Sequence, residues 1–207
     1  MKYFVIALCA VIAYLLGSVN TAIILSKIKG KDIRKEGSGN AGATNTLRVM
    51  GKKAAGLVAL FDGLKGVIAI LAAKFICILL GIEGTDKNTA VYLSALFVML
   101  GHIYPLYFGF KGGKGVMTTI AVIFMLDWRI GLILFGACII IMLTTKYVSL
   151  GSCIGAAAFP VLVAILHTED VFFIVVSAIV GILAIFKHRT NIVRLVKGTE
   201  SKLNFSK

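Results

Sequence analysis

Long apolar runs separated by short polar stretches occupy most of this 207-residue chain. Crossing the hydrocarbon core of a bilayer takes about 20 apolar residues, whereas a membrane β-barrel would have short alternating segments. In lipid, a helix satisfies its own backbone polar groups. The runs therefore predict an all-α integral membrane protein with about seven transmembrane helices. They cover approximately residues 3–27, 54–82, 89–109, 115–126, 130–145, 151–166 and 171–187.

Two of the predicted segments depart from a simple spanning helix. Segment 115–126 has only about a dozen residues. It can be a short packed helix or one half of a re-entrant hairpin, which lipid permits where protein buries it. Five full spans plus one re-entrant hairpin is therefore the alternative topology. Segment 54–82 is predicted to begin as an interfacial turn before it spans, because it is interrupted by Asp62, Gly63, Lys65 and Gly66.

Lysine and arginine gather in alternate loops, above all between residues 27 and 53 and in the tail from Lys187 to Lys207. The opposite loops are short and acidic, as at residues 83–86 and at Glu169-Asp170. Because basic loops stay in the cytoplasm, the N-terminus is predicted outside and the C-terminus in the cytoplasm of a multi-pass plasma (inner) membrane protein. No repeat or linker divides the chain, so we expect one membrane domain over residues 1–207.

The composition narrows the functional classes further. The chain is 59% hydrophobic and has a formal net charge of +13. Its charges fall in loops between apolar segments rather than on a soluble face, so nucleic acid is not an expected partner. The cysteines have no CxxC spacing, so neither a metal site nor a redox pair is predicted, and no cofactor is expected. These cysteines are Cys9, Cys77, Cys138 and Cys153.

The first polar stretch that exceeds what topology requires runs from Gly37 to Arg48, on the predicted cytoplasmic side. Glycines let backbone amides turn toward one anion, and a guanidinium fits phosphate with two hydrogen bonds. A flexible basic loop is the plainer alternative, but it would not need two asparagines and spaced hydroxyls. Arg48 is the predicted catalytic cation. The predicted phosphate-binding residues are Ser38, Gly39, Asn40, Gly42, Thr44 and Asn45.

A second candidate is the glycine-rich loop that ends at Gly115. It is not a Walker loop, because its glycine spacing differs and Gly115 stands where a hydroxyl would bind magnesium. Lysine between glycines at the start of a helix can still bind an anion, although lysines are also common in cytoplasmic loops. Lys111, Gly112 and Gly113 are predicted to bind phosphate, and Lys114 is a predicted catalytic cation.

A third candidate comes from two separate stretches near the C-terminal end. His188 and Asn191 are three residues apart and would share one face of a helix, so they can serve one site; Ser152 is the other catalytic candidate. The alternative for His188 is a residue at the water interface. Asp62 and Lys65 are interpreted as an ion pair at the membrane edge, and His102 as a packing or kink-satisfying residue.

The predicted cytoplasmic face is rich in cations and poor in carboxylates. Such a face suits multiply charged anions without a divalent metal, for example phosphate groups attached to a lipid chain. The alternative function is a phosphate-ester transporter. Such a protein would place charges near the bilayer midplane, where only Lys74 is found, and would contain repeats. A structural membrane protein would not need the glycine-asparagine loop. The carboxylates on this face are Asp32, Glu36, Asp62 and Glu200.

Six motifs extend over essentially the whole chain. In order, they are Gly37-Ser-Gly-Asn-Ala-Gly-Ala-Thr-Asn followed by Arg48, Asp62-Gly-Leu-Lys-Gly66, Gly101-His-Ile-Tyr-Pro105, Lys111-Gly-Gly-Lys-Gly115, Tyr147-Val-Ser-Leu-Gly-Ser152 and His188-Arg-Thr-Asn191. In this order the chain resembles the bacterial membrane acyl-phosphate:glycerol-3-phosphate acyltransferases.

The resemblance implies an enzyme that moves a fatty acyl group from acyl phosphate to the 1-hydroxyl of glycerol 3-phosphate. The products would be lysophosphatidate and phosphate, in the first step of bacterial phospholipid synthesis. It also implies a seven-helix membrane protein with a cytoplasmic active site, and possible contact with the enzyme that makes acyl phosphate. By resemblance, active-site positions fall on Ser38, Asn40, Thr44, Arg48, Lys114, Ser152, His188 and Asn191.

Overall fold

The computed structural model of this protein describes residues 1–203, so Lys207 of the predicted cytoplasmic tail lies outside the described residues. Throughout the described chain, the regular structure is helical. The chain divides into two compact units, Met1–Met125 and the part from Leu126 onward, and each is described by itself. The prediction of a single membrane domain stays a prediction.

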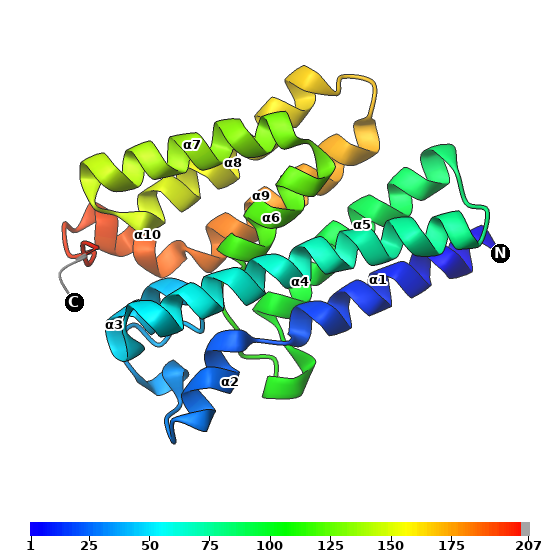
Figure 1. Cartoon of the computed structure of the whole chain (residues 1–207). Helices are drawn as coiled ribbons and strands as arrows, with labels where there is room; N and C mark the ends of the chain where they lie inside the picture. Colours follow the sequence, from blue (N-terminus) through cyan, green and yellow to red (C-terminus); the bar gives the residue numbers. More distant parts are fainter. Residues whose placement is uncertain (204–207) are drawn as a thin grey trace. The chain divides into compact units, whose positions relative to one another are not determined.

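Three long helices of unit 1, α1, α4 and α5, pack together along their lengths (Figure 1). Gly17 and Gly101 permit the close approach of α1 and α5, because a Cβ at Gly17 would collide with the Val98 carbonyl and one at Gly101 with the Tyr14 carbonyl. Small residues at helix crossings are typical of membrane proteins. The helices are α1 (Lys2–Ser18), α2 (Thr21–Ile28), η1 (Ile33–Lys35), α3 (Ala43–Met50), α4 (Lys52–Leu79), α5 (Gly84–Ile103), η2 (Leu106–Phe108) and α6 (Val116–Leu126).

The first predicted segment is broken, which the apolar run did not indicate. α1 ends at Ser18, and α2 begins after Asn20, whose Oδ1 accepts a hydrogen bond from the Ile23 N–H at 3.1 Å. Lys65 Nζ donates to the carbonyl oxygens of Gly17 and Val19, at 3.0 and 2.8 Å. Buried carbonyls need partners in lipid, so Lys65 makes the break possible.

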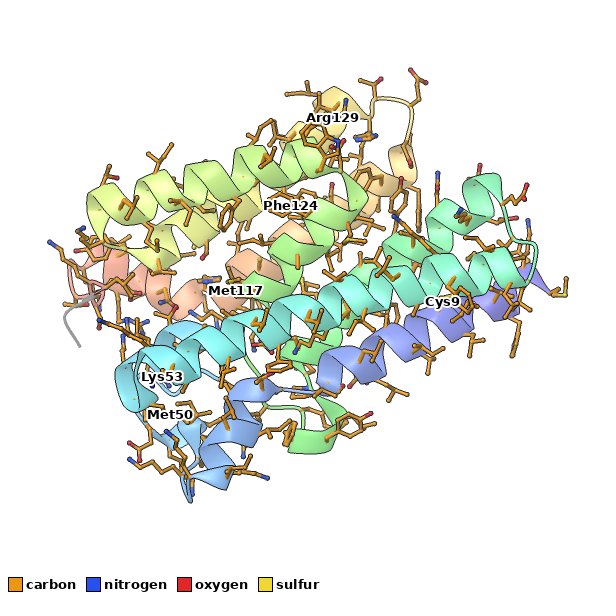
Figure 2. The ribbon with its side chains drawn as sticks, in the orientation of Figure 1. Cys9, Met50, Lys53, Met117, Phe124 and Arg129 are labelled. Atoms are coloured by element: carbon orange, nitrogen blue, oxygen red, sulfur yellow. The ribbon has the colours of Figure 1, made fainter. Side chains whose placement is uncertain are left out.

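The predicted interfacial turn in segment 54–82 is wrong, because α4 is one continuous helix of 28 residues. Asp62 and Lys65 form the ion pair that the sequence predicted, with 3.1 Å between Oδ1 and Nζ. Their side chains are only 3% and 8% exposed, so the pair is buried within unit 1. Each charge is satisfied there, and the helix has no need to unwind. At the start of α4, Lys53 lies close to Met50 of α3 (Figure 2).

The fourth segment forms the short helix α6, which has 11 residues. Lys74 Nζ of α4 donates to the Met125 carbonyl oxygen near the end of α6, at 3.2 Å. This contact gives the mid-span charge a structural role, since the last carbonyls of a helix lack intrahelical partners. The third segment ends at Ile103 rather than at residue 109, because Pro105 cannot continue the helix.

Unit 2 consists of consecutive helices in which α7 packs on α8 and α8 on α9 (Figure 1). Asp127 caps α7: its carboxylate accepts from the Arg129 N–H at 2.8 Å and from His167 Nε2 at 2.8 Å. Hydrogen bonds from Arg129, labelled in Figure 2, and from His167 lower the pKa of Asp127. The helices are α7 (Trp128–Thr145), α8 (Val148–Leu166), α9 (Val171–Lys187) and α10 (Arg189–Val196).

Each of the seven predicted apolar segments is therefore mainly helical within the described residues, with the break in the first segment and the earlier end of the third as the departures. Five helical stretches there are long and apolar enough to cross a bilayer, and the bent pair α9 and α10 would make a sixth. α6 is shorter than these spans. The number of crossings, and the placement of the N-terminus outside and the C-terminus in the cytoplasm, stay predictions.

Candidate active site

The loop between η1 and α3 is shaped by the side chain of Asn45. Asn45 Oδ1 accepts a hydrogen bond from the Ser38 N–H at 2.8 Å, and Nδ2 donates to the carbonyls of Ile33 and Glu36 at 3.2 and 2.9 Å. The residue is 1% exposed. The Asn45 amide therefore holds the loop in shape, and its predicted role in binding phosphate stays a prediction.

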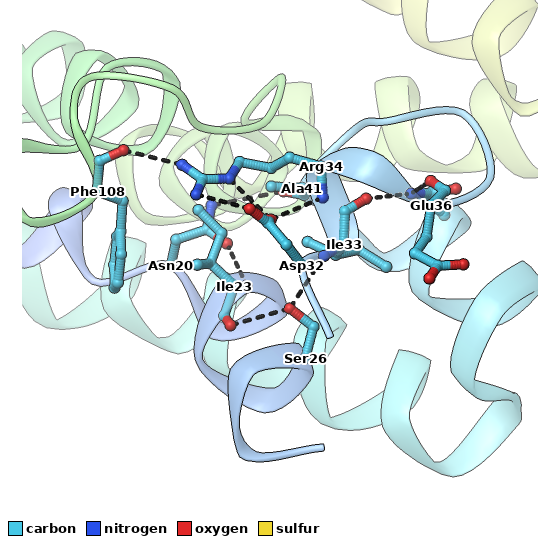
Figure 3. Close-up of polar contacts among 10 residues, drawn as sticks. Asn20, Ile23, Ser26, Asp32, Ile33, Arg34, Glu36, Ala41 and Phe108 are labelled. Carbon is cyan, nitrogen blue, oxygen red and sulfur yellow. Dashed lines mark hydrogen bonds and ion pairs between the residues drawn. The ribbon is translucent and has the colours of Figure 1, made fainter. Parts of the chain in front are cut away.

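A second set of contacts ties the residues before this loop to η2 (Figure 3). The Arg34 guanidinium binds both carboxylate oxygens of Asp32, each at 2.9 Å, and donates to the Phe108 carbonyl at 3.0 Å. The hydrogen bond from Arg34 lowers the pKa of Asp32 to about 2. Asn20 Nδ2 donates to the Ala41 carbonyl at 3.4 Å, so the α1–α2 break also supports the loop.

The other predicted residues of this stretch lie where a phosphate could reach them. α3 begins after Gly42 without an acidic residue in its first turn, so its first N–H groups favour an anion. The backbone turns at Gly39, where φ is +71°. Ser38, Gly39 and Arg48 are exposed to solvent. Asn40, Gly42 and Thr44 are half-buried.

The second glycine-rich loop packs directly on the first. The N–H groups of Gly112 and Gly113 donate to the carbonyls of Ile103 and His102, each at 3.2 Å. A Cβ at Gly113 would collide with the Ala41 carbonyl and with His102 Nε2, so only glycine fits. Two stretches that the sequence identified separately therefore meet within unit 1. Lys111 is exposed and Lys114 half-buried, and α6 begins at Val116.

In unit 2, Glu200 gathers three donors from two helices. Oε1 accepts from Asn191 Nδ2 at 2.6 Å and from Ser149 Oγ at 2.8 Å, and Oε2 accepts from Arg194 Nε at 2.7 Å. Burial opposes the charge of Glu200, but these hydrogen bonds outweigh burial and lower its pKa. Sequence reasoning missed this role, and no motif spacing indicated it.

His188 and Asn191 do not lie on one continuous helix as predicted. His188 is at the junction of α9 and α10, which bend by 58°, and Asn191 is in the first turn of α10. His188 is 3% exposed, and its Nδ1 lies 2.8 Å from the Ala184 carbonyl. Ser152 Oγ donates to the Val148 carbonyl at 3.0 Å within α8 and is half-buried.

His102 has polar contacts with ionisable side chains, which its interpretation as a packing or kink-satisfying residue did not include. Its Nδ1 lies 2.9 Å from Lys65 Nζ and 3.9 Å from Asp62 Oδ1. His102 is 3% exposed. The signal that could have found this cluster is that Asp62, Lys65 and His102 are all ionisable residues within apolar segments.

These features define a class of protein: an integral membrane protein with multiple apolar helices. Two of its glycine-rich loops lie against each other at Gly113 and Ala41, and they contain lysine and arginine. Such loops suit the binding of phosphate groups.

Comparison with known proteins identifies the family. A family model described as glycerol-3-phosphate acyltransferase matches residues 7–198. A glycerol-3-phosphate acyltransferase of Thermoanaerobacter pseudethanolicus is 47% identical over 95% of this chain and 94% of its own. Another, from Clostridioides difficile, is 40% identical over 100% of both chains. The chain therefore belongs to the glycerol-3-phosphate acyltransferase family.

Solved structures agree with this assignment. The crystal structure of PlsY, an integral membrane glycerol 3-phosphate acyltransferase, in its glycerol 3-phosphate form has a TM-score of 0.83 and 36% identity, over 96% of each chain. The lysophosphatidic acid form of PlsY has a TM-score of 0.81 and 37% identity, over 96% of this chain and 95% of that one.

Proposed function

We propose that this enzyme transfers a fatty acyl group from acyl phosphate to the 1-hydroxyl of glycerol 3-phosphate. The products are lysophosphatidate and inorganic phosphate, in the first step of bacterial phospholipid synthesis. The observation that carries the proposal is the contact between the two glycine-rich loops of unit 1 at Ala41 and Gly113. Both substrates carry a phosphate group, and adjoining glycine-rich loops that contain Arg48, Lys111 and Lys114 suit such groups.

The substrates are supported to different degrees. The PlsY structures similar to this chain are described as glycerol 3-phosphate and lysophosphatidic acid forms, which supports this acceptor and this product. Acyl phosphate as donor rests on the resemblance of the motifs. The same resemblance supports an active site at the cytoplasmic side of the plasma (inner) membrane. Contact with the enzyme that makes acyl phosphate is part of the proposal.

In this proposal, Arg48 and Lys114 bind phosphate oxygens. Arg48 presents a planar fork and Lys114 a point charge. The side chains of Ser38, Asn40, Thr44 and Lys111 are proposed to complete phosphate binding. Glycines let a phosphate approach the backbone closely, and they are Gly39, Gly42, Gly112 and Gly113. Asn45 shapes the first loop and remains a proposed phosphate-binding residue. By resemblance alone, Ser152, His188 and Asn191 are proposed as catalytic residues.

The chemical step is direct acyl transfer. The 1-hydroxyl oxygen of glycerol 3-phosphate attacks the acyl carbonyl carbon, and the bond between that carbon and the donor's phosphate oxygen breaks. The hydroxyl proton passes either to the departing phosphate or to His188. Because the Ala184 carbonyl lies 2.8 Å from His188 Nδ1, a neutral ring would carry its proton there. Acyl phosphate is already activated, so positioning and charge stabilisation do most of the work.

The test is purified protein in lipid with labelled glycerol 3-phosphate, comparing acyl phosphate with acyl-CoA as donor, with and without a chelator. We expect lysophosphatidate from acyl phosphate alone, at a rate that chelation leaves unchanged. Product from acyl-CoA at a comparable rate would contradict the proposed donor. No product from either donor, in folded protein, would contradict the proposed activity.

A further inference from the structure

We infer that His102 is a positioning residue that holds the Lys111–Gly115 loop in its phosphate-binding shape, with the Asp62–Lys65 pair fixing the orientation of its ring. Asp62, Lys65 and His102 are 2%, 7% and 3% exposed. The inference rests on the phosphate-binding role proposed for this loop. It assigns a function to a buried cluster that takes no part in the chemical step described above.

The first step in the argument is the coordination of Lys65. Four acceptors lie within 3.1 Å of its Nζ: the Gly17 carbonyl at 3.0 Å, the Val19 carbonyl at 2.8 Å, His102 Nδ1 at 2.9 Å and Asp62 Oδ1 at 3.1 Å. An ammonium group has three N–H donors and no acceptor, so the three donors are shared among these four groups and His102 Nδ1 accepts from Lys65. A neutral imidazole then carries its proton on Nε2. Lys65 therefore selects the tautomer of His102.

The second step is the direction of that Nε2 atom. A Cβ on Gly113 would collide with His102 Nε2, so the ring edge lies directly against the loop backbone. The backbone of His102 also contacts the loop, because its carbonyl accepts from the Gly113 N–H at 3.2 Å. Gly113 is thus held between the ring, the His102 carbonyl and the Ala41 carbonyl. A change in the ring position would move the loop at this point.

The third step is that the same cluster fixes the end of the loop. Thr118, in the first turn of α6, donates from Oγ1 to the Asp62 carbonyl at 2.8 Å. Thr21 Oγ1 donates to Asp62 Oδ1 at 3.4 Å. Asp62 therefore connects the α1–α2 break, His102 and the start of α6. His102 therefore contacts the loop at Gly113, and Asp62 fixes the helix that follows the loop through Thr118.

Energetics separate this role from a merely structural one. A buried ion pair is often no more stabilising than well-packed apolar residues, because burial removes the hydration of both charges. His102 is the member nearest the loop, and its loss leaves the Asp62–Lys65 pair intact. Changes at His102 should therefore alter substrate binding more than unfolding.

The test compares two substitutions, each of which places an amide group near the position of one ring nitrogen of His102. His102→Asn places an amide oxygen near the Nδ1 position, so Lys65 keeps an acceptor but the Nε2 edge is lost. His102→Gln places its terminal amide near Nε2. We expect His102→Asn to raise KM for glycerol 3-phosphate or for acyl phosphate at least tenfold, with a smaller change in kcat. His102→Gln should recover a substantial part of that loss.

The controls are melting temperature and a second histidine. Both His102 variants should melt within about 3 °C of the wild type, and His167→Asn in unit 2 should leave both KM values within twofold. The inference is overturned if folded His102→Asn has both KM values within twofold of the wild type. It is also overturned if His102→Gln restores nothing, or if both variants lose stability in proportion to activity.

A measurement on the wild type keeps the inference testable if these variants do not fold. The chain has three histidines, so ¹⁵N-histidine labelling gives few signals. At neutral pH, His102 should be a neutral ring protonated on Nε2, and glycerol 3-phosphate or acyl phosphate should shift its resonance. A ring protonated on Nδ1, or a resonance that neither substrate moves, would exclude the role. This spectrum does not depend on turnover, so failure of the proposed donor would be seen separately.

Discussion

Asp62 in unit 1 and Glu200 in unit 2 are both buried carboxylates, but they are stabilised in different ways. Asp62 lies inside the long helix α4 and pairs with Lys65, three residues further along the same helix. Glu200 follows α10 and accepts hydrogen bonds from α8 and α10. The difference indicates that a charge within an apolar helix depends on a cation close by. A carboxylate in the chain after a helix can instead join separate segments.

The most sensitive test of this comparison is Asp62→Ala. The substitution leaves the Lys65 ammonium buried without its counter-ion. The free energy of unfolding in detergent should therefore fall by about 3–5 kcal/mol. Adding Lys65→Met should restore part of that loss by removing the isolated charge. It should not restore all of it, because the carbonyls of Gly17 and Val19 lose their donor. If the free energy of unfolding of Asp62→Ala alone is within about 1 kcal/mol of the wild-type value, the ion pair is unimportant for stability.

Glu200→Gln should have a smaller effect, because its three partners are dipoles or a partly exposed guanidinium. The Arg194 side chain is 38% exposed, so solvent can replace part of that contact. A hydrogen bond to a charged group contributes about 1.5–3 kcal/mol before screening is considered. We expect the free energy of unfolding in detergent to fall by about 2 kcal/mol in Glu200→Gln. A loss larger than that of Asp62→Ala would reverse the comparison.

The pH dependence of stability sharpens the same point. The pKa of Glu200 is lowered from its ordinary value of 4.5 in the folded protein. The ionised group therefore stabilises the fold above about pH 4.5, and this contribution is lost as pH falls through the lowered pKa. Melting temperature recorded from pH 7 to pH 3 should fall less steeply in Glu200→Gln. Identical slopes in both proteins would mean that folding does not lower the pKa of Glu200.

The smallest expected effect comes from Ser149→Ala, with Ser152→Ala as its matched control on α8. Ser149 donates to Glu200, so its loss should cost about 1 kcal/mol. Ser152 bonds only the Val148 carbonyl of its own helix among the contacts described, so its removal should change stability by less than about 0.5 kcal/mol. Equal effects of the two substitutions would remove Ser149 from the Glu200 cluster.

The sequence predicted much of the fold, because lipid imposes long apolar segments whatever their contacts. It also predicted the Asp62–Lys65 pair, whose partners lie three residues apart. The break at Val19 and Asn20 was not predictable from its own neighbourhood. It depends on Lys65, 46 residues away from Val19.

The candidate site divides in the same way. Each glycine-rich loop could be identified from its own residues. The composition expected of a phosphate-binding loop, namely glycines and basic side chains close together in the sequence, is visible without knowledge of the fold. The contact between Gly113 and Ala41 could not, because it depends on tertiary packing. Glu200 was missed for the same reason: its partner Ser149 is 51 residues away.

The measurement that most directly tests phosphate binding by the two adjoining loops is kcat/KM of Gly113→Ala, with Gly56→Ala as control. The added Cβ at Gly113 would collide with the Ala41 carbonyl, whereas one at Gly56 on α4 would meet nothing within 4 Å. We predict a loss of at least about 30-fold for Gly113→Ala, equivalent to about 2 kcal/mol of transition-state stabilisation, and a change below twofold for Gly56→Ala. A folded Gly113→Ala enzyme with wild-type kcat/KM would contradict the account.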